Sequence, residues 1–457
     1  MRSEGLGSAE APPLACPVLA GSKTRLDAPT VPLAEPDHFV AAAPGIAPLD
    51  ESEQTHAPFP QHGCGALVLG GSHGALAVVR SLGRHGIPVW FASDDNVLAR
   101  FSRFARKGLS WPGPNDAGAA DCLLELGRRH RLFGWVLVPC ADEEARLVSQ
   151  NHAALSRMFR VRTPAWKTMR WGYDKHRMNE RAAALGLDLP RSFCADSRDD
   201  LVNADLRFPV ILKPAVKHHG NAFTLAKAWR ADDRAALLAR YDEAAALVGA
   251  DAVVVQELIP GRGAAQFSYA ALWDRGRPVA SLTARRSRQY PIDFGYTSTF
   301  VETIARPDVE YAACRFLDSI GYDGLVEVEF KYDARDRRIK LLDVNARTWT
   351  WIALGQRAGV DFPYLFWRLA MGEAVPSARG VPGIGWMHAS RDIVAACQEM
   401  AAGYLKPRDY LASLRHPLQF AAFAADDPLP GVLDMPLSLA RLLTHRLPAA
   451  LRLLSLP

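Results

Sequence analysis

Residues 325–347 read LVEVEFKYDARDRRIKLLDVNAR, two alternating apolar segments joined by a charged turn. This pattern predicts an antiparallel β-hairpin with strands at 325–332 and 339–345. Because successive side chains of a strand point to opposite faces, Glu327 and Glu329 share one face of the first strand. Two glutamates on one strand face indicate that this face is either solvated or holds a cation.

The second strand of the hairpin carries Asp343 and Asn345, which strict alternation places on one face together with Ile339 and Leu341. If Glu329 pairs opposite or diagonally to Asp343, their Cβ atoms lie about 4.5–8 Å apart. One Mg²⁺ ion, which prefers a few short bonds to oxygen and fills its shell with water or phosphate, can then be held by Glu329, Asp343 and Asn345. The alternative is a strand end with ordinary turn polarity and a solvated acidic face.

Two segments further upstream suit a phosphate and a purine. Lys213 ends the apolar strand 208–214, a position where an ammonium group is expected to meet an anion, although a surface lysine with a packed stem is the alternative. The polar connection 216–221 can fold its amides over phosphates. The strand 252–258 ends in a Pro-Gly turn, and its backbone can hydrogen-bond the rim of a purine.

Further strands are predicted at 267–273 and 279–286, and a cluster of arginines lies at the end of the second and just after it. Arg285, Arg286 and Arg288 stand close together before Tyr290. Clustered guanidinium groups can bind a carboxylate or phosphate through paired hydrogen bonds. A solvated basic strand is the alternative.

The region from residue 65 predicts a different architecture. An apolar strand at 65–69 leads into a glycine turn at 70–74, a helix with apolar periodicity and a second strand at 87–93. A second strand-helix unit follows, so we expect a small parallel sheet of the Rossmann-like type. The turn GGSHG does not match the dinucleotide pattern GxGxxG, which argues against a nicotinamide or flavin site.

Composition narrows the classes of function that remain. The chain has 457 residues and a formal net charge of +5, too little to indicate a nucleic-acid-binding protein. Its 7 cysteines are scattered without metal-like spacing, which favours a reducing cytoplasm. No apolar segment is long enough to span a bilayer, and no signal peptide is expected. Residues 1–60 hold 10 of the 32 prolines and an excess of acids, which predicts a disordered tail.

Taken in order, these motifs resemble those of the ATP-grasp superfamily, in particular its carboxylate-amine ligase-like branch, which includes D-aspartate ligase-type enzymes. The resemblance covers about residues 65–425 and rests on DK at 174–175, LKP at 212–214, QELIPG at 256–261, VEF at 328–330 and DVNAR at 343–347. It implies an α/β plus α+β fold in four parts. These are a disordered tail (1–60), a Rossmann-like pre-ATP-grasp domain (61–165), a two-lobed ATP-grasp domain (166–385) and a mostly helical C-terminal region (386–457).

The resemblance also assigns roles to residues of this chain. The ATP-binding residues it implies are Lys175, Lys213, Gln256, Glu257, Leu258 and Ile259. The implied ligands of Mg²⁺, which Mn²⁺ can replace, are Glu329, Asp343 and Asn345. Arg347 would be the catalytic residue that meets the γ-phosphate, and Arg286 and Arg288 would bind the substrate. Two features depart from the family pattern, because the phosphate loop has only Gly220 and Asp343 stands where a glutamate is commoner.

The implied activity is that of an ATP-dependent ligase, which activates a small carboxylate as an acyl phosphate for attack by an amine. Its expected partners are these small molecules, with no nucleic acid and no transmembrane segment, and a homodimer is left open. Two alternatives remain. One is an ATP-binding sensor or scaffold without catalysis, and the other is bicarbonate activation as in biotin-type carboxylases, for which the sequence offers no biotinyl-lysine segment.

Overall fold

The computed structural model describes residues 59, 63–94, 97–195, 197–215, 221–226, 228–292 and 297–441. Most of the predicted disordered tail, most of the 216–221 connection and the basic end of the chain after Arg441 lie outside the described residues. From Gly63 onward the described residues belong to one compact unit, Pro60–Pro457. The division of this unit into three domains stays a prediction.

The first sheet is parallel and has five strands in the order β3-β2-β1-β4-β5, as the Rossmann-like expectation requires. Gly70, with a φ of 58°, makes the turn between β1 and α1 because that backbone region favours glycine. Helix α1 packs its apolar side against the sheet through Leu76, Val79 and Leu82. The elements are β1 (Ala66–Leu69), α1 (His73–Arg84), β2 (Val89–Ala92), β3 (Ala105–Leu109), α2 (Ala119–Arg129), β4 (Val136–Pro139), α3 (Asp142–Gln150), α4 (His152–Leu155) and β5 (Arg160–Val161).

Two helices and a small antiparallel sheet follow, with strand order β6-β9-β7-β8. Asp174 caps α6, because its carboxylate accepts hydrogen bonds from the backbone amides of His176 and Arg177. The elements are α5 (Trp166–Tyr173), α6 (Lys175–Ala184), β6 (Ser192–Cys194), α7 (Arg198–Asn203), β7 (Val210–Pro214), α8 (Ala222–Leu225), β8 (Trp229–Ala231), α9 (Arg234–Val248) and β9 (Val253–Glu257).

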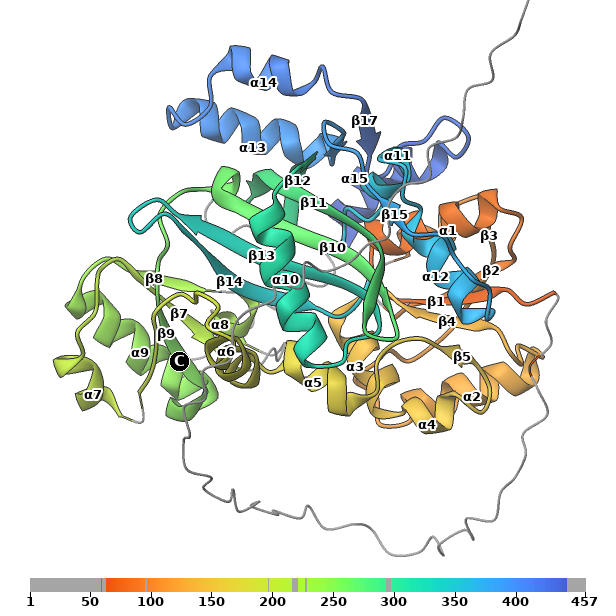
Figure 1. Cartoon of the computed structure of the whole chain (residues 1–457), viewed down its shortest axis with the longest axis horizontal. Coiled ribbons are helices and arrows are strands. Elements are labelled where there is room, and N and C mark those ends of the chain that lie inside the picture. The colour runs from red at the N-terminus through yellow and green to blue at the C-terminus, as the bar shows by residue number, and fades with distance from the viewer. Residues whose placement is uncertain are drawn as a thin grey trace, which may run out of the picture. The chain divides into compact units, whose positions relative to one another are not determined.

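The large sheet joins β14-β13-β10-β11-β12-β16-β17, and β15 pairs with β11. Helix α10 crosses one face of this sheet (Figure 1), where its apolar side meets the even-numbered residues of β13. The strands are β10 (Gln266–Asp274), β11 (Arg277–Tyr290), β12 (Thr297–Ile304), β13 (Gly324–Asp333), β14 (Arg338–Asn345), β15 (Ala378–Arg379), β16 (Gly385–Met387) and β17 (Leu418–Phe420). The helices are α10 (Pro307–Ser319), α11 (Ala353–Arg357), α12 (Phe362–Ala370), α13 (Ala389–Ala401), α14 (Pro407–Ser413) and α15 (Leu429–Arg441).

The hairpin of β13 and β14 contains one irregularity that the alternation rule misses. Glu329 pairs with Asp343, but the next pair is Phe330 with Leu341, so Leu342 is an extra residue in β14. Leu341 is therefore buried under the helices with Phe330, on the face opposite to Asp343. The prediction that Leu341 and Asp343 share a face was wrong, because this bulge reverses the alternation between them.

Candidate functional site

The face of the large sheet opposite to α10 carries a group of polar side chains at the β13–β14 end. Glu329 lies directly opposite Asp343, and Glu327 lies directly opposite Asn345. Asn345 Nδ2 donates to Glu329 Oε1 over 3.1 Å. These four side chains form what we call the hairpin face.

Neighbouring strand β10 supports both glutamates. Ser268 Oγ donates to Glu327 Oε1 over 2.9 Å, and Gln266 Nε2 donates to Glu329 Oε2 over 2.7 Å. Ser268 pairs with Glu329 and Gln266 pairs with Lys331 across the β10–β13 ladder, so both hydrogen bonds run diagonally between the adjacent strands. They fix both carboxylates in place.

Burial and like charge act together on Glu327. Its side chain is 3% exposed, and burial together with the charge of Glu329 raises its pKa to about 7, although Arg286 and Arg347 act in the opposite direction. Arg286 comes from β11, and its Nη2 donates to Glu329 Oε1 over 3.2 Å. The buried Nε atom of Arg286 has no hydrogen-bond partner among the described residues. The hairpin face thus concentrates negative charge beside one guanidinium.

Lys175 and Arg347 bring two further cations to this face. Lys175 is the first residue of α6, and its Nζ lies 3.6 Å from Asp343 Oδ2. Arg347 Nη2 donates to Asn345 Oδ1 over 3.3 Å. The same guanidinium donates to both oxygens of Asp142 at the start of α3, over 2.8 and 3.0 Å. The parallel-sheet region and the hairpin therefore meet at Arg347.

The donor set fits a hard divalent cation. Glu329, Asp343 and Asn345 offer carboxylate and amide oxygens from two adjacent strands, and such ligands suit Mg²⁺ or Mn²⁺. A bound cation would also offset the repulsion that raises the pKa of Glu327. These residues would hold the ion, with Glu327 beside them, and the predicted set remains a proposal.

The predicted purine and phosphate residues gather on the small sheet. Lys213 Nζ donates to Gln256 Oε1 over 2.9 Å, and Gln256 Nε2 donates to Ser192 Oγ over 2.9 Å. Leu258 donates its backbone amide to Pro209 O over 3.2 Å, and Ile259 is 4% exposed. Gln256 and Glu257 end β9, and Leu258 and Ile259 continue the connection that leaves the small sheet.

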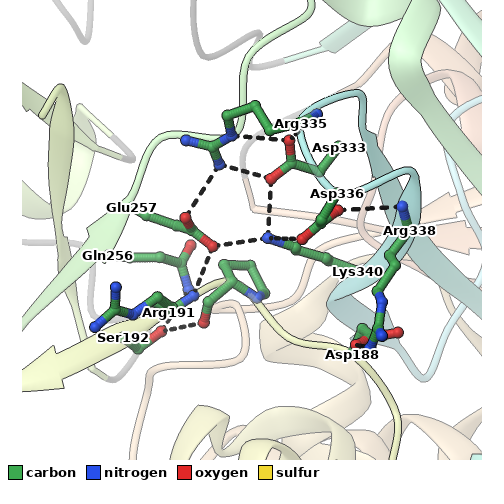
Figure 2. A network of polar contacts seen from close by, with 11 residues as sticks. Asp188, Arg191, Ser192, Gln256, Glu257, Asp333, Arg335, Asp336, Arg338 and Lys340 are labelled. Atoms are coloured by element: carbon green, nitrogen blue, oxygen red, sulfur yellow. Dashed lines mark hydrogen bonds and ion pairs between the residues drawn. The ribbon is translucent and has the colours of Figure 1, made fainter. Parts of the chain in front are cut away.

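Glu257 joins this connection to the hairpin (Figure 2). Its carboxylate accepts from Lys340 Nζ over 2.9 Å, from Arg335 Nη2 over 3.0 Å and from the backbone amide of Arg191 over 2.9 Å. Lys340 also donates to Asp333, which is fully buried, over 2.8 Å. Although burial opposes it, these partners lower the pKa of Glu257. The Glu257 side chain, which was predicted to face adenine, is held in an ionic network between the small sheet and the large sheet.

Arg288 is not brought to the hairpin face. Its guanidinium, 3% exposed, donates to both oxygens of Asp392 in α13 over 2.9 and 2.8 Å. The rings of Phe300 and Tyr410 cover it at 4.2 and 4.9 Å. In this structure Arg288 anchors the C-terminal helices, while Arg286 remains beside Glu329.

Sequence reasoning missed four residues that complete the site: Gln266, Ser268, Glu327 and Asp142. The signal for Glu327 was present, since it stands two residues before Glu329 on the same strand face. The signals for Gln266 and Ser268 depend on which strand lies beside β13. Asp142 is 205 residues from Arg347, and no local pattern connects them.

Comparison with known proteins supports this architecture. No family model matches the chain. The biotin carboxylase domain dimer of 2-oxoglutarate carboxylase from Hydrogenobacter thermophilus, solved with MgADP and bicarbonate, superposes with a TM-score of 0.56 at 16% identity, over 71% of this chain and 74% of that one. L-amino acid ligase from Bacillus licheniformis superposes with a TM-score of 0.51 at 16% identity, over 68% and 74%. The chain therefore has the ATP-grasp fold.

One curated protein is related to the chain in sequence as well. D-aspartate ligase from Enterococcus faecium (strain Aus0004) is 23% identical over 277 residues, which cover 56% of this chain and 64% of that protein. The chain is thus a distant homologue of D-aspartate ligase and matches less than two thirds of its length. No helix among the described residues is long and apolar enough to cross a membrane.

Proposed function

We propose that this protein is an ATP- and Mg²⁺-dependent ligase that joins a small carboxylate to an amine. The observation that carries the proposal is the direct pairing of Glu329 in β13 with Asp343 in β14 on one face of the sheet, with Lys175 Nζ 3.6 Å from Asp343 Oδ2. The distant relationship to D-aspartate ligase and the fold of L-amino acid ligase support the same class of reaction.

In this proposal the residues of the chain bind and align the phosphates. Lys175 and Lys213 contact them, Gln256 to Ile259 line the adenine, and Arg347 meets the γ-phosphate. A bound Mg²⁺ ion supplies further neutralisation of phosphate charge. Arg286 binds the substrate carboxylate, since its guanidinium already reaches the hairpin face through Glu329.

The proposed reaction needs no nucleophilic side chain from the protein. An oxygen of the substrate carboxylate attacks the γ-phosphorus, and ADP leaves as the bond from that phosphorus to the bridging oxygen breaks. The nitrogen of the amine then attacks the acyl carbon, loses a proton and displaces phosphate. The chain contributes charge and alignment, which are the main requirements of phosphoryl transfer.

The proposal is tested with the full-length protein, MgATP and pools of amino acids. We expect phosphate release that requires both an acid and an amine, and a product whose mass equals their sum minus water. Asp343→Ala should abolish this turnover, whereas Asp318→Asn, an exposed acid on α10, should leave it unchanged. Normal MgATP turnover by Asp343→Ala would contradict the metal assignment.

Two outcomes would support the alternatives instead. Tight ATP binding without phosphate release in any mixture would favour a nucleotide sensor or scaffold. Isotope from labelled bicarbonate appearing in the product would favour a carboxylase reaction.

Substitution of Mn²⁺ for Mg²⁺ should preserve ligation, because both ions accept oxygen ligands.

A further inference from the structure

Three side chains that can ligate a metal meet in the interior, and the proposed ligase reaction does not use them. His73 begins α1, His388 directly precedes α13 and Asp434 lies within α15. They are 4%, 2% and 7% exposed. One ligand atom from each lies within 4.8 Å of the other two. We infer that His73, His388 and Asp434 bind one divalent cation of the zinc class.

The distances between the ligand atoms are close to those of a zinc site. His73 Nε2 lies 2.9 Å from Asp434 Oδ1, and His388 Nε2 lies 3.6 Å from Asp434 Oδ2. Bonds of about 2.0–2.2 Å to zinc in a tetrahedron separate neighbouring ligand atoms by about 3.3–3.5 Å. The two separations that end at Asp434 differ from this range by a few tenths of an ångström, and all three ligand atoms lie within 4.8 Å of one another, so a modest rearrangement of the side chains would seat the ion.

A buried nitrogen atom points independently to a ligand. His388 Nε2 has no hydrogen-bond partner among the described residues, although its side chain is 2% exposed. A hydrogen-bonded pair of His73 and Asp434 accounts for two of the three residues and leaves this nitrogen unsatisfied beside them. An unpaired polar atom in the interior is costly, and a cation bound at Nε2 removes that cost.

The surroundings hold His388 in the form that binds metals. Its Nδ1 lies 3.3 Å from Ser390 Oγ, so Nδ1–H can donate to the hydroxyl and leave the Nε2 lone pair toward Asp434. An imidazole that is protonated at Nδ1 and has a free lone pair at Nε2 is in the state that ligates zinc.

The chemistry of the ligands selects the class of ion. Two imidazoles and one carboxylate favour zinc and similar borderline cations, whereas Mg²⁺ prefers an all-oxygen shell. This site is therefore distinct from the proposed Mg²⁺ site on the hairpin face. A bound ion would crosslink α15 to the turn after β1, next to a second contact in which Arg80 Nε donates to Asp427 Oδ2 over 2.9 Å.

The test uses the untagged full-length protein, stripped with a chelator and titrated with Zn²⁺ in excess Mg²⁺. We expect one tightly bound zinc per chain by elemental analysis and calorimetry. His388→Ala and Asp434→Asn should weaken zinc binding by more than about 100-fold, since loss of a direct ligand costs more than loss of a supporting contact. Asp427→Asn is the matched control, because it breaks a neighbouring buried contact of the same helical region and should keep the zinc.

Three results would overturn the inference. They are no bound zinc in the wild-type protein, wild-type affinity in His388→Ala, and equal loss of zinc in Asp427→Asn. Should either ligand variant fail to fold by circular dichroism, the absorption spectrum of the wild-type protein loaded with Co²⁺ decides the matter. Visible bands of a four-coordinate ion support the site, and their absence excludes it.

Discussion

Asp142 accepts two hydrogen bonds from Arg347, although 205 residues separate the two along the chain. Burial disfavours the charged form of Arg347, but the charge and hydrogen bonds of Asp142, with Glu327 and Asp343, raise its pKa above the usual range. The cation proposed to meet the γ-phosphate is therefore held in place by a carboxylate of the parallel-sheet region. Through this pairing, the parallel-sheet region positions a residue of the proposed reaction.

Arg347→Gln should reduce kcat by about 10³-fold or more, because an arginine that stabilises phosphoryl transfer contributes on this scale. Asp142→Asn keeps the cation and loses one ionic partner, so a loss of about tenfold is expected. Steady-state kinetics of phosphate release checks both values. Equal losses in the two variants would indicate that Arg347 serves the fold rather than the reaction.

The raised pKa of Glu327 predicts how the free energy of unfolding depends on pH. Its folded-state pKa is raised from 4.5 to about 7, so between these values the folded protein holds a proton that the unfolded chain has lost. The free energy of unfolding should therefore decrease as the pH rises from about 4.5 to 7. Urea denaturation of the nucleotide-free protein at pH 5, 6, 7 and 8 measures it.

Glu327→Gln should flatten part of this dependence and gain stability relative to the wild type as the pH increases. Glu144, whose pKa burial also raises to about 7, titrates with the same sign. Glu144→Gln is thus the matched variant. Each of the two substitutions should remove part of the decrease in the free energy of unfolding between about pH 4.5 and 7. A pH profile unchanged in both would contradict the assignment of these two protons.

Lys340 should stabilise the ionic network that links the small sheet to the large sheet. Lys340→Met removes one of the two cations that contact both Glu257 and Asp333, and leaves Arg335 as the other. Because Arg335 still offsets part of the buried negative charge, the loss of stability should be below the about 3–5 kcal/mol that a wholly unpaired buried charge costs. Urea unfolding checks this value, with Lys167→Met on an exposed position of α5 as the control.

Nucleotide binding provides a second measurement on the same variant. Because Glu257 begins the connection proposed to line adenine, Lys340→Met should also weaken ATP binding, while Lys167→Met should not. An unchanged dissociation constant for ATP in Lys340→Met would separate the network from the nucleotide site.

Arg288 should contribute to the stability of the fold, whereas Arg286 should contribute to the binding of the carboxylate substrate. Arg288→Met and Asp392→Asn each leave one buried charge without its partner, so both should lower the melting temperature to a similar extent. Arg286→Gln should instead raise KM for the carboxylate substrate. Differential scanning calorimetry and initial rates check the two expectations. A KM effect confined to Arg288→Met would restore the original substrate-binding prediction for that residue.

Local patterns in the sequence were enough to predict much of the fold. Alternation identified the hairpin strands, and the Gly-rich turn followed by apolar periodicity identified the parallel sheet. Asp174 carries the local signal of a helix cap, because a carboxylate at that position satisfies amide groups of the first turn. Each of these signals depends on residues within a few positions of one another.

The remaining features depend on partners that are distant in the chain. The bulge at Leu342 follows from how Leu341 packs under the helices, and the pairing of Arg288 with Asp392 follows from where α13 docks. Strand β12 was not predicted, although it lies between β11 and β16 in the large sheet. Such contacts are decided by tertiary packing and leave no periodic trace in the sequence.

The extra residue in β14 determines which changes of length this strand can accommodate. A chain that lacked Leu342 would form a regular ladder, with Leu341 still directed at the helices and Asp343 still opposite Glu329. Loss of Lys340 would instead move Ile339 to the other face of the strand and place an apolar side chain beside Glu257 and Asp333, where a cation now lies. Single-residue deletions only two positions apart would thus have opposite consequences, one preserving the arrangement of carboxylates and the other dismantling the support beneath it.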